Sequence, residues 1–341
     1  MHISSSSASR SFFLTGLIVL LPLISSCDSA QIPNQSLEVA IKGLYSAALS
    51  DDGTLAAVGS INHGGSFWRL GTNERLYNWN HSSEEASTIV VSDISPDNNF
   101  ALTADPATLV LWDTQSGEGL RYWTAPGEIL AAKLSPNART ALLGLSDHSA
   151  VLFDIQRGGV IHTFKHGNRV RSVDLSRNGK LALTGSEDGT SILWDVATGK
   201  ELVRHKFDAE VKLVKLSPDG SIALSMSKFD KALLWQTRSG EALGEIPLGA
   251  ERLKRGISFS AANFSRDNRL LLTGRPDQIV QLWDLATLTE VARWKMPKRS
   301  TWKPTSTAVI AVSFGKNEGE YTAVASNGFI HQLKLPETTP Y

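Results

Sequence analysis

Residues 175–195 read LSRNGKLALTGSEDGTSILWD, and this stretch decides the fold class of the chain. Two short apolar runs, residues 181–184 and 191–194, are separated by a turn rich in Ser, Asp and Gly. Runs of this length are too short for helices, and turns of this composition join antiparallel strands. The stretch therefore predicts two adjacent β-strands, preceded by a Ser-Arg-Asn-Gly turn and ended by Trp-Asp.

The same pattern recurs along the chain. Seven copies align on an apolar run ending in Ser or Gly, a turn such as Pro-Asp-Gly, a second apolar run and a third run. The third runs end at Trp68, Trp112, Phe153, Trp194, Trp235, Trp283 and Leu333. Successive ends are 44, 41, 41, 41, 48 and 50 residues apart, close to the length of a four-stranded propeller blade.

The seven copies predict a closed ring. A single four-stranded sheet cannot bury both of its faces, so such sheets must stack around an axis. The last copy supplies only three strands, whereas residues 36–41 alternate like a strand and have no copy of their own. We therefore expect an all-β, seven-bladed β-propeller of four-stranded antiparallel blades, closed by the N-terminal strand joining the last blade.

Period, Ser turn and terminal Trp-Asp together resemble the WD-repeat family over about residues 37–335. The copy nearest to the family pattern is the fourth. There the resemblance implies a structural tetrad of His166, Thr184, Asp188 and Trp194, in which the imidazole bridges the Asp and the Thr, and the Thr reaches the indole N–H. A His beside an Asp is also typical of a catalytic pair, but buried polar groups need partners and the tetrad supplies them.

Composition and motifs favour a binding protein over an enzyme. The 34 basic residues balance the 34 acidic ones, which gives no attraction to nucleic acid. The sequence has no phosphate-binding Gly motif, no nucleophile elbow and no metal-ligand spacing among its eight His residues. We expect no catalytic residue, no metal and no cofactor. A hydrolase or lyase that uses the propeller channel is the less favoured alternative.

The N-terminal segment predicts a membrane anchor. Residues 12–24, FFLTGLIVLLPLI, are too few to span a bilayer but suit the core of a signal peptide. Residues 23–27, LISSC, resemble the lipobox of bacterial lipoproteins, with Ile24 where that family favours Leu. The resemblance implies acylation of Cys27, for example with palmitate. Cys27 is the only Cys in the chain, which favours this interpretation over an ordinary secretory leader ending in a small residue.

These features predict the organisation and location of the chain. Residues 1–26 form a lipoprotein signal peptide, 27–36 the lipidated Cys and a polar tether, 37–335 the WD-repeat propeller and 336–341 a C-terminal tail. Several acyl chains hold a protein stably on a membrane. The location implied is the bacterial cell envelope, facing the periplasm. In enteric bacteria Asp28 after the acylated Cys favours the inner membrane, and the outer membrane is the alternative.

Two long connections predict a partner-binding surface, called here the basic ledge. They follow the fifth and sixth copies and contain Arg252, Lys254, Arg255, Lys295, Lys298, Arg299, Trp302 and Lys303. Cations beside an aromatic side chain suit an acidic protein segment or an anionic envelope polymer. The alternative is an ordinary solvated surface.

The sequence thus predicts a membrane-anchored, non-catalytic scaffold that binds one or more proteins. The alternative is a subunit of an envelope assembly complex with a large apolar interface on its rim. Exposed apolar residues on outer strands would favour that alternative, and the candidates are Leu76, Tyr77, Trp79, Leu120, Tyr122 and Trp123.

Overall fold

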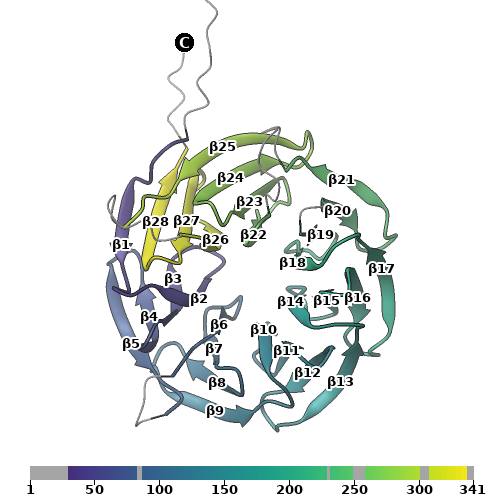
Figure 1. Cartoon of the computed structure of the whole chain (residues 1–341). Helices are drawn as coiled ribbons and strands as arrows, with labels where there is room; N and C mark the ends of the chain where they lie inside the picture. Colours follow the sequence, from purple (N-terminus) through teal and green to yellow (C-terminus); the bar gives the residue numbers. More distant parts are fainter. Residues whose placement is uncertain (1–29, 83–86, 229–230, 249–257, 300–306, 336–341) are drawn as a thin grey trace, which may run out of the picture.

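The structure is a computed structural model, and it describes residues 30–82, 87–228, 231–248, 258–299 and 307–335. These residues form 28 strands in seven four-stranded sheets, and no helix. All strand pairs within the sheets are antiparallel, and the sheets surround a common axis (Figure 1). The predicted all-β, seven-bladed propeller is confirmed.

Blades 1 to 4 are each built from four consecutive strands. Blade 1 contains β2 (Leu44–Leu49), β3 (Leu55–Ser60), β4 (Gly64–Arg69) and β5 (Glu74–Trp79). Blade 2 contains β6 (Val91–Ile94), β7 (Phe100–Ala104), β8 (Thr108–Asp113) and β9 (Gly119–Thr124). Blade 3 contains β10 (Ile129–Leu134), β11 (Thr140–Leu145), β12 (Ser149–Asp154) and β13 (Val160–Lys165). Blade 4 contains β14 (Val170–Leu175), β15 (Leu181–Ser186), β16 (Thr190–Asp195) and β17 (Glu201–Lys206).

The remaining three blades complete the ring. Blade 5 contains β18 (Val211–Leu216), β19 (Ile222–Ser227), β20 (Ala232–Gln236) and β21 (Ala242–Ile246). Blade 6 contains β22 (Ala261–Phe264), β23 (Leu270–Gly274), β24 (Ile279–Asp284) and β25 (Thr289–Lys295). Blade 7 contains β26 (Val309–Phe314), β27 (Glu320–Ala325), β28 (Phe329–Lys334) and β1 (Gln35–Glu38).

The N-terminal strand closes the ring, as predicted. Strand β1 is the outer strand of blade 7 and pairs antiparallel with β28, with Leu37 opposite Ile330. The strand is shorter at its C-terminal end than the residues 36–41 expected from the sequence. The reason is that the N–H groups of Val39 and Ala40 both donate to the carbonyl of Gly328, and the chain then leaves the blade.

A buried Ser builds the turn between the first two strands of a blade. In blade 4 the Ser176 hydroxyl donates to Asn178 Oδ1 (2.8 Å) and accepts from the backbone N–H of Leu181 (2.9 Å). The N–H of Gly179 donates to the Ser176 carbonyl, and Gly179 has a φ of 69°, which favours glycine. Ser followed by Asp or Asn two residues later is therefore a local signal for this turn.

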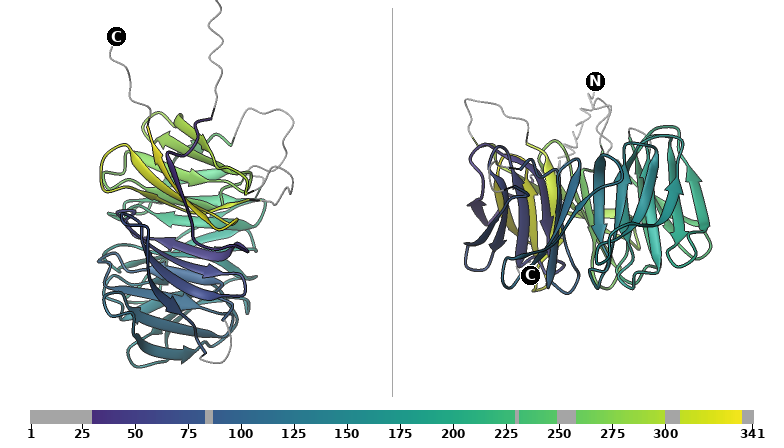
Figure 2. Two further views of the ribbon diagram at one scale, coloured as in Figure 1. Left: turned by 90° about the vertical axis from the view of Figure 1, so that its left-hand side faces the viewer. Right: turned by 90° about the horizontal axis from the view of Figure 1, so that it is seen from below.

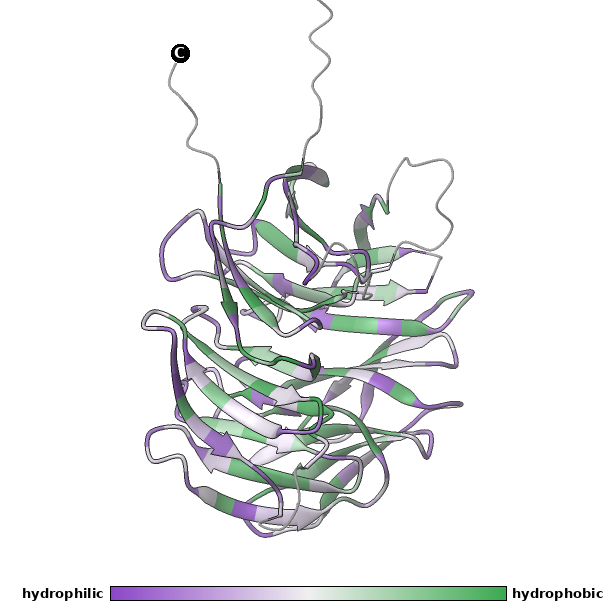
Figure 3. Cartoon of the chain, turned by 60° about the vertical axis from the view of Figure 1, so that its left-hand side comes forward, coloured by the Kyte–Doolittle hydropathy of each residue, from purple (hydrophilic) through white to green (hydrophobic). Residues whose placement is uncertain are grey.

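The turns divide the disc into two faces, because the strands of each blade alternate in direction. The Ser turns lie on one face, called here the turn face. The opposite face carries the link from each outer strand to the next inner strand, and is called the connection face. Figure 2 shows both faces edge-on. In Figure 3 hydrophobic residues follow the strands and hydrophilic residues lie at many turns.

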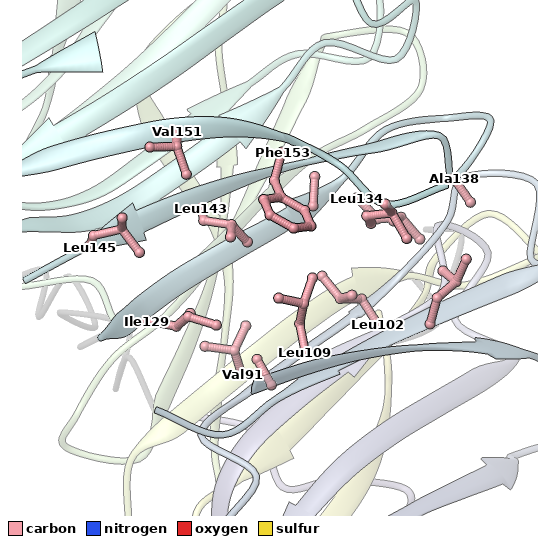
Figure 4. Packing of buried hydrophobic residues seen from close by; sticks show 14 residues of the cluster. Val91, Leu102, Leu109, Ile129, Leu134, Ala138, Leu143, Leu145, Val151 and Phe153 are labelled. Atoms are coloured by element: carbon pink, nitrogen blue, oxygen red, sulfur yellow. The ribbon is translucent and has the colours of Figure 1, made fainter. Parts of the chain in front are cut away.

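Apolar side chains between neighbouring blades form the core. Between blades 2 and 3, Leu102, Leu109, Leu143 and Phe153 belong to one buried cluster (Figure 4). Each such side chain stabilises the fold by about 1.5–3 kcal/mol through its burial.

Neighbouring blades also approach closely. A Cβ atom on Gly185 of blade 4 would lie 2.7 Å from the side chain of Val211, the first residue of blade 5. Any larger residue at position 185 would therefore require the neighbouring blade to shift.

Candidate functional site

The predicted tetrad residues of blade 4 lie together, in a network that runs from His166 and Asp188 at the connection face into the buried part of the sheet. His166 Nε2 lies 2.8 Å from Thr184 Oγ1, which also accepts the indole N–H of Trp194 (2.8 Å). His166 Nδ1 lies 3.1 Å from Thr190 Oγ1 and 3.6 Å from Asp188 Oδ2. The Thr190 hydroxyl donates to Asp188 Oδ1 (2.6 Å), so the imidazole reaches the carboxylate mainly through this hydroxyl.

The charges of this network suit a structural role. Burial lowers the pKa of His166, and the opposing attraction of Asp188 does not restore it, so the imidazole is neutral at pH 7. Burial raises the pKa of Asp188, but hydrogen bonds from Thr190 and Gly167 outweigh this and lower it. The side chain of His166 is 0% exposed. A neutral, enclosed imidazole whose ring nitrogens are both occupied holds two strands together.

Blade 2 contains a second network of this kind, which the sequence analysis missed. His81 Nε2 lies 2.8 Å from Thr103 Oγ1, and Thr103 Oγ1 accepts the indole N–H of Trp112 (2.7 Å). His81 Nδ1 lies 2.8 Å from Thr108 Oγ1 and 3.3 Å from Asp105 Oδ2. The spacing from His to Thr is 22 residues here against 18 in blade 4, because the connection is longer. The Asp follows the Thr by two residues here and by four residues in blade 4, so the spacing of the fourth copy does not reveal this network.

Other blades keep only the indole end of the network. The indole N–H of Trp235 donates to Ser225 Oγ (3.0 Å), and that of Trp283 donates to Thr273 Oγ1 (2.9 Å). These hydroxyls lie on the second strand of their blades, as Thr184 does in blade 4. Blade 3 has Phe153 in place of the Trp, and this side chain packs into the apolar cluster of Figure 4.

The basic ledge is described only in part. Arg252, Lys254, Arg255, Trp302 and Lys303 lie outside the described residues. Lys295 and Lys298 are exposed on the connection side of blade 6.

Arg299 is engaged within the protein. Its guanidinium donates to Glu38 Oε1 (2.7 Å) and to the carbonyls of Ala40 (2.6 Å) and Asn327 (2.8 Å). It also lies 4.9 Å from the centre of the Phe329 ring. Arg299 therefore fastens the closing strand, and its role in partner binding stays a prediction.

Most aromatic side chains expected on the rim join neighbouring blades instead. Trp79 is 1% exposed, and its ring stacks on Trp112 of blade 2 with centroids 5.0 Å apart. Its indole N–H donates to the Gly117 carbonyl (3.1 Å). Trp123 is half-buried, and its N–H donates to the carbonyl of Ile155 in blade 3 (2.7 Å). The expectation that Trp79 is exposed is wrong, because the outer strand of blade 1 uses it to hold blade 2.

Apolar side chains of other outer strands are exposed. Leu76 and Tyr77 are half-buried, whereas Leu120 and Tyr122 are 37% and 53% exposed. Comparable residues continue around blades 3 to 6 at Val160, Ile161, Leu202, Leu243 and Val291. The rim therefore carries one or two exposed apolar residues on each blade from the second to the sixth.

Alternating charges line part of the central channel, and the sequence analysis did not identify them. The position concerned lies on the inner strand two residues before the turn Ser, or before Gly315 in blade 7. From blade 1 to blade 7 its residues are Ala48, Asp93, Lys133, Asp174, Lys215, Asn263 and Ser313. The axial cavity that several of them line has a volume of about 200 Å³.

These charges pair between blades. Lys133 Nζ lies 2.8 Å from Asp93 Oδ1, and the N–H of Leu134 donates to Asp93 Oδ2 (2.7 Å). Burial lowers the pKa of Lys133, but the attraction of Asp93 and Asp174 outweighs it and raises the pKa. Lys215 Nζ lies 3.5 Å from Asp174 Oδ2. We call this set, Asp93 to Lys215, the charge ladder.

One ion pair crosses the turn-face mouth of the channel. Arg177 of blade 4 reaches Asp51 of blade 1, with 2.8 Å between Nη2 and Oδ2. Blades 1 and 4 lie on different sides of the ring (Figure 1). Both side chains are partly exposed. This ion pair, Arg177 with Asp51, therefore lies across the opening of the channel and is called here the bar.

The predicted lipidation site lies outside the described residues, as do the signal peptide and the C-terminal tail. The first described residues attach to the rim of blade 6. The Gln31 N–H donates to the Arg293 carbonyl (2.8 Å), and the Gln31 carbonyl accepts from the Lys295 N–H (2.8 Å). In the described ranges, no helix is long and apolar enough to cross a membrane. The same ranges contain no group of three or more His, Cys, Asp or Glu side chains placed to hold a metal.

A comparison with protein families locates the repeat. Residues 158–195 match the family described as WD domain, G-beta repeat. The matched segment contains β13 to β16 and all four tetrad residues of blade 4. A search of curated proteins finds no match. The matched repeat and the seven-bladed architecture together support a WD-repeat β-propeller.

Proposed function

We propose that this protein is a lipid-anchored, non-catalytic scaffold of the bacterial envelope that binds protein partners. A WD-repeat propeller fits an interaction scaffold in general. The observation that carries the proposal is the attachment of Gln31 to the rim, next to the candidate lipobox. Gln31 follows Cys27 by four positions, a distance that an extended chain covers in at most about 14 Å. An acylated Cys27 would therefore hold blade 6 near the membrane and leave both faces of the disc open.

The chemistry of the described residues favours binding over catalysis. The two imidazoles that adjoin carboxylates, His81 and His166, are buried and held between hydroxyl groups. Burial lowers the pKa of both, so neither is a charged acid at pH 7. A general base needs access to the proton that it removes, and these enclosed rings offer none.

Lipidation is tested by metabolic labelling with palmitate followed by membrane fractionation. The full chain should incorporate label and sediment with membranes, and Cys27→Ala should lose both properties. Ser26→Ala is the matched control, because it keeps a small residue before the Cys and should still be labelled. Equal membrane retention of the full chain and Cys27→Ala would refute the anchor.

Partner binding is tested by crosslinking in native envelopes and mass spectrometry of the captured proteins. We expect a defined set with the anchored chain and a reduced set with Cys27→Ala. Charge reversal at Lys298 and Lys303 tests the basic ledge. Lys316→Glu, on the turn face, is the matched control for charge. If the ledge variant recovers the same partners as the control, the ledge is not the binding surface.

The exposed rim favours a second candidate, a subunit of an envelope assembly complex. Tyr122 of β9 and Ile161 of β13 lie on the outer strands of adjacent blades and are 53% and 46% exposed. Contiguous exposed apolar residues mark interaction surfaces. In a native gel of detergent-solubilised envelopes, Tyr122→Ser with Ile161→Ser should release the protein from a large complex. Unchanged migration would remove this candidate.

A further inference from the structure

The charge ladder stops at blade 6. Lys133 stands between two carboxylates, Asp93 at 2.8 Å and Asp174 on the other side. Lys215 has Asp174 on one side only, at 3.5 Å, and this carboxylate oxygen already accepts the N–H of Leu216 (2.8 Å). On its other side the equivalent residue is the neutral Asn263. Within the described part of the chain, Lys215 therefore has fewer acidic neighbours than Lys133.

A small cavity opens beside this break, at the turn-face mouth. Its volume is about 60 Å³, which accommodates a carboxylate group, and its lining includes Lys215, Asn263 and Arg266. Two carboxylates, Asp51 and Asp174, also line it, but each is already paired with a cation. Arg266 is exposed, and no ion pair of its guanidinium is present among the described residues. The neighbouring Asp267 is occupied, because its Oδ1 accepts the Ser265 hydroxyl (2.6 Å). Two cations and an amide thus converge where an acid would continue the ladder.

Apolar groups and the bar define the rest of the mouth. Phe264 and Phe314 line the same cavity, and Phe264 is 3% exposed. Arg177 also lines it and is drawn over the opening by Asp51. A mouth with cationic groups at its base, apolar walls and an exchangeable cation above suits a peptide more than a free inorganic ion.

We propose that the turn-face mouth binds the carboxylate of an acidic peptide segment from a protein partner. Lys215 and Arg266 hold the carboxylate by charge, and the Asn263 amide donates a hydrogen bond to it. The half-buried Phe314 contacts the adjoining apolar part of the peptide. Arg177 exchanges Asp51 for the peptide when the site fills. This site deepens the proposed scaffold function and rests on it, but lies on the opposite face from the basic ledge.

The test uses the full chain in neutral detergent and peptides that carry an uncharged BODIPY dye on their N-terminus, read by fluorescence anisotropy. One peptide, Gly-Ser-Gly-Ser-Leu-Phe, has a free carboxyl terminus, and a second, Gly-Ser-Phe-Glu-Gly-Ser, is amidated and carries only a side-chain carboxylate. An amidated Gly-Ser-Gly-Ser-Leu-Phe is the uncharged control. At least one carboxylate peptide should bind, which identifies the source of the group, and the control should not. No binding of either at about 1 mM overturns the proposal.

Variants separate this site from general surface charge. Lys215→Met and Arg266→Ala should each weaken binding at least tenfold. Lys316→Met removes a cation at the blade 7 position equivalent to Arg266 and should change affinity less than twofold. An equal loss in all three variants overturns the site, because it would mean non-specific attraction. Thermal melting checks that each variant is folded. If Lys215→Met does not fold, Arg266→Ala alone tests the site.

Asn263→Asp provides a test in the opposite direction. The new carboxylate continues the ladder beside Lys215, so it should raise the melting temperature and weaken peptide binding at least tenfold. An Asn263→Asp chain that binds the peptide as before overturns the site. The two proposals can fail separately. If the peptides bind in the anisotropy assay but Lys215→Met still captures the same partners in envelopes, the scaffold function stands and the peptide site is not what binds those partners.

Discussion

Blades 4 and 7 hold their strands together by different means. Blade 4 uses four consecutive strands and a polar network of His166, Thr184 and Trp194 within one segment of the chain. Blade 7 has no such network among its described residues, and its outer strand comes from the other end of the propeller. There Arg299 and the backbone pairs of β1 supply the links. A blade can thus depend on local hydrogen bonds or on closure over a long sequence distance.

The largest expected effect comes from removing the closing strand. Deletion of residues 35–40 removes the pairing of β1 with β28 and the acceptors of Arg299 at Glu38 and Ala40. At about 1 kcal/mol for each lost hydrogen bond, the free energy of unfolding should fall by at least about 4 kcal/mol. Thermal denaturation should show a melting temperature lower by about 10 °C or more.

A synthetic peptide of residues 31–41 serves as the control for that deletion. Added in excess, it should bind the open edge of β28 and restore most of the lost melting temperature. A deleted chain that melts like the intact one would show that blade 7 does not depend on β1.

The next effect concerns the polar network of blade 4. Thr184→Val leaves the Trp194 N–H and one His166 nitrogen without their partner, and should cost about 3 kcal/mol in urea unfolding. Thr273→Val in blade 6 is the matched control, because Thr273 accepts the Trp283 N–H but has no imidazole partner among the described residues. Its cost should be about 1–2 kcal/mol. Equal costs would mean that the imidazole adds nothing to blade 4.

A pH effect distinguishes the imidazoles of the two blades. His331 in β28 is 0% exposed, and burial lowers its pKa to about 4 from an ordinary value of 6.5. The folded protein therefore binds fewer protons than the unfolded chain between these values, so protonation favours unfolding. The contribution of His331 is neutral above about pH 6.5, becomes destabilising as the pH falls and levels off below about 4.

The measurement compares the wild type with His331→Gln, whose amide can still bond to Ser36 in β1. Between pH 7 and pH 5 the wild type should lose about 2 kcal/mol more stability than the variant. His166 differs because Asp188 opposes the effect of burial on its pKa. Identical pH profiles for the wild type and His331→Gln would contradict the assignment.

The smallest effect separates two neighbouring cations of the predicted ledge. Arg299→Ala loses three intramolecular acceptors and should cost about 1–2 kcal/mol of stability. Lys298→Ala changes an exposed side chain and should alter stability by less than about 0.5 kcal/mol. Chemical denaturation of both variants decides the point, and equal stabilities would show that Arg299 does not fasten β1.

Most of the fold could be predicted from the sequence because its signals are local. The Ser176 turn, for example, depends on residues within five positions, and it recurs at a regular interval. The closing strand was predictable for another reason: the last copy lacked a fourth strand. Its C-terminal limit was not predictable, because it depends on the contact of Val39 and Ala40 with Gly328, far away in the sequence.

The candidate sites were less predictable, since they depend on contacts between blades. The alternation of apolar residues on β5 is the same whether Trp79 is exposed on the rim or stacked on Trp112 of blade 2, so the sequence alone does not distinguish the two. The basic segment around Arg299 does not indicate that its guanidinium donates to Glu38, because Glu38 lies at the opposite end of the sequence. The charge ladder did leave a signal: Asp93, Lys133 and Asp174 hold the same place before the turn Ser. That signal becomes visible only when the seven copies are aligned on the turn.

The pairing of β1 with β28 also constrains the order of events during biosynthesis. Ser36 and His331, which bond across this pair, are 295 residues apart, so the first strand to be made must wait for the last. Every earlier blade can form its own sheet while the chain is still emerging. The ring itself cannot close until residues 329–334 are also free to pair, and until then the unpaired first strand can pair with the edge of a wrong strand.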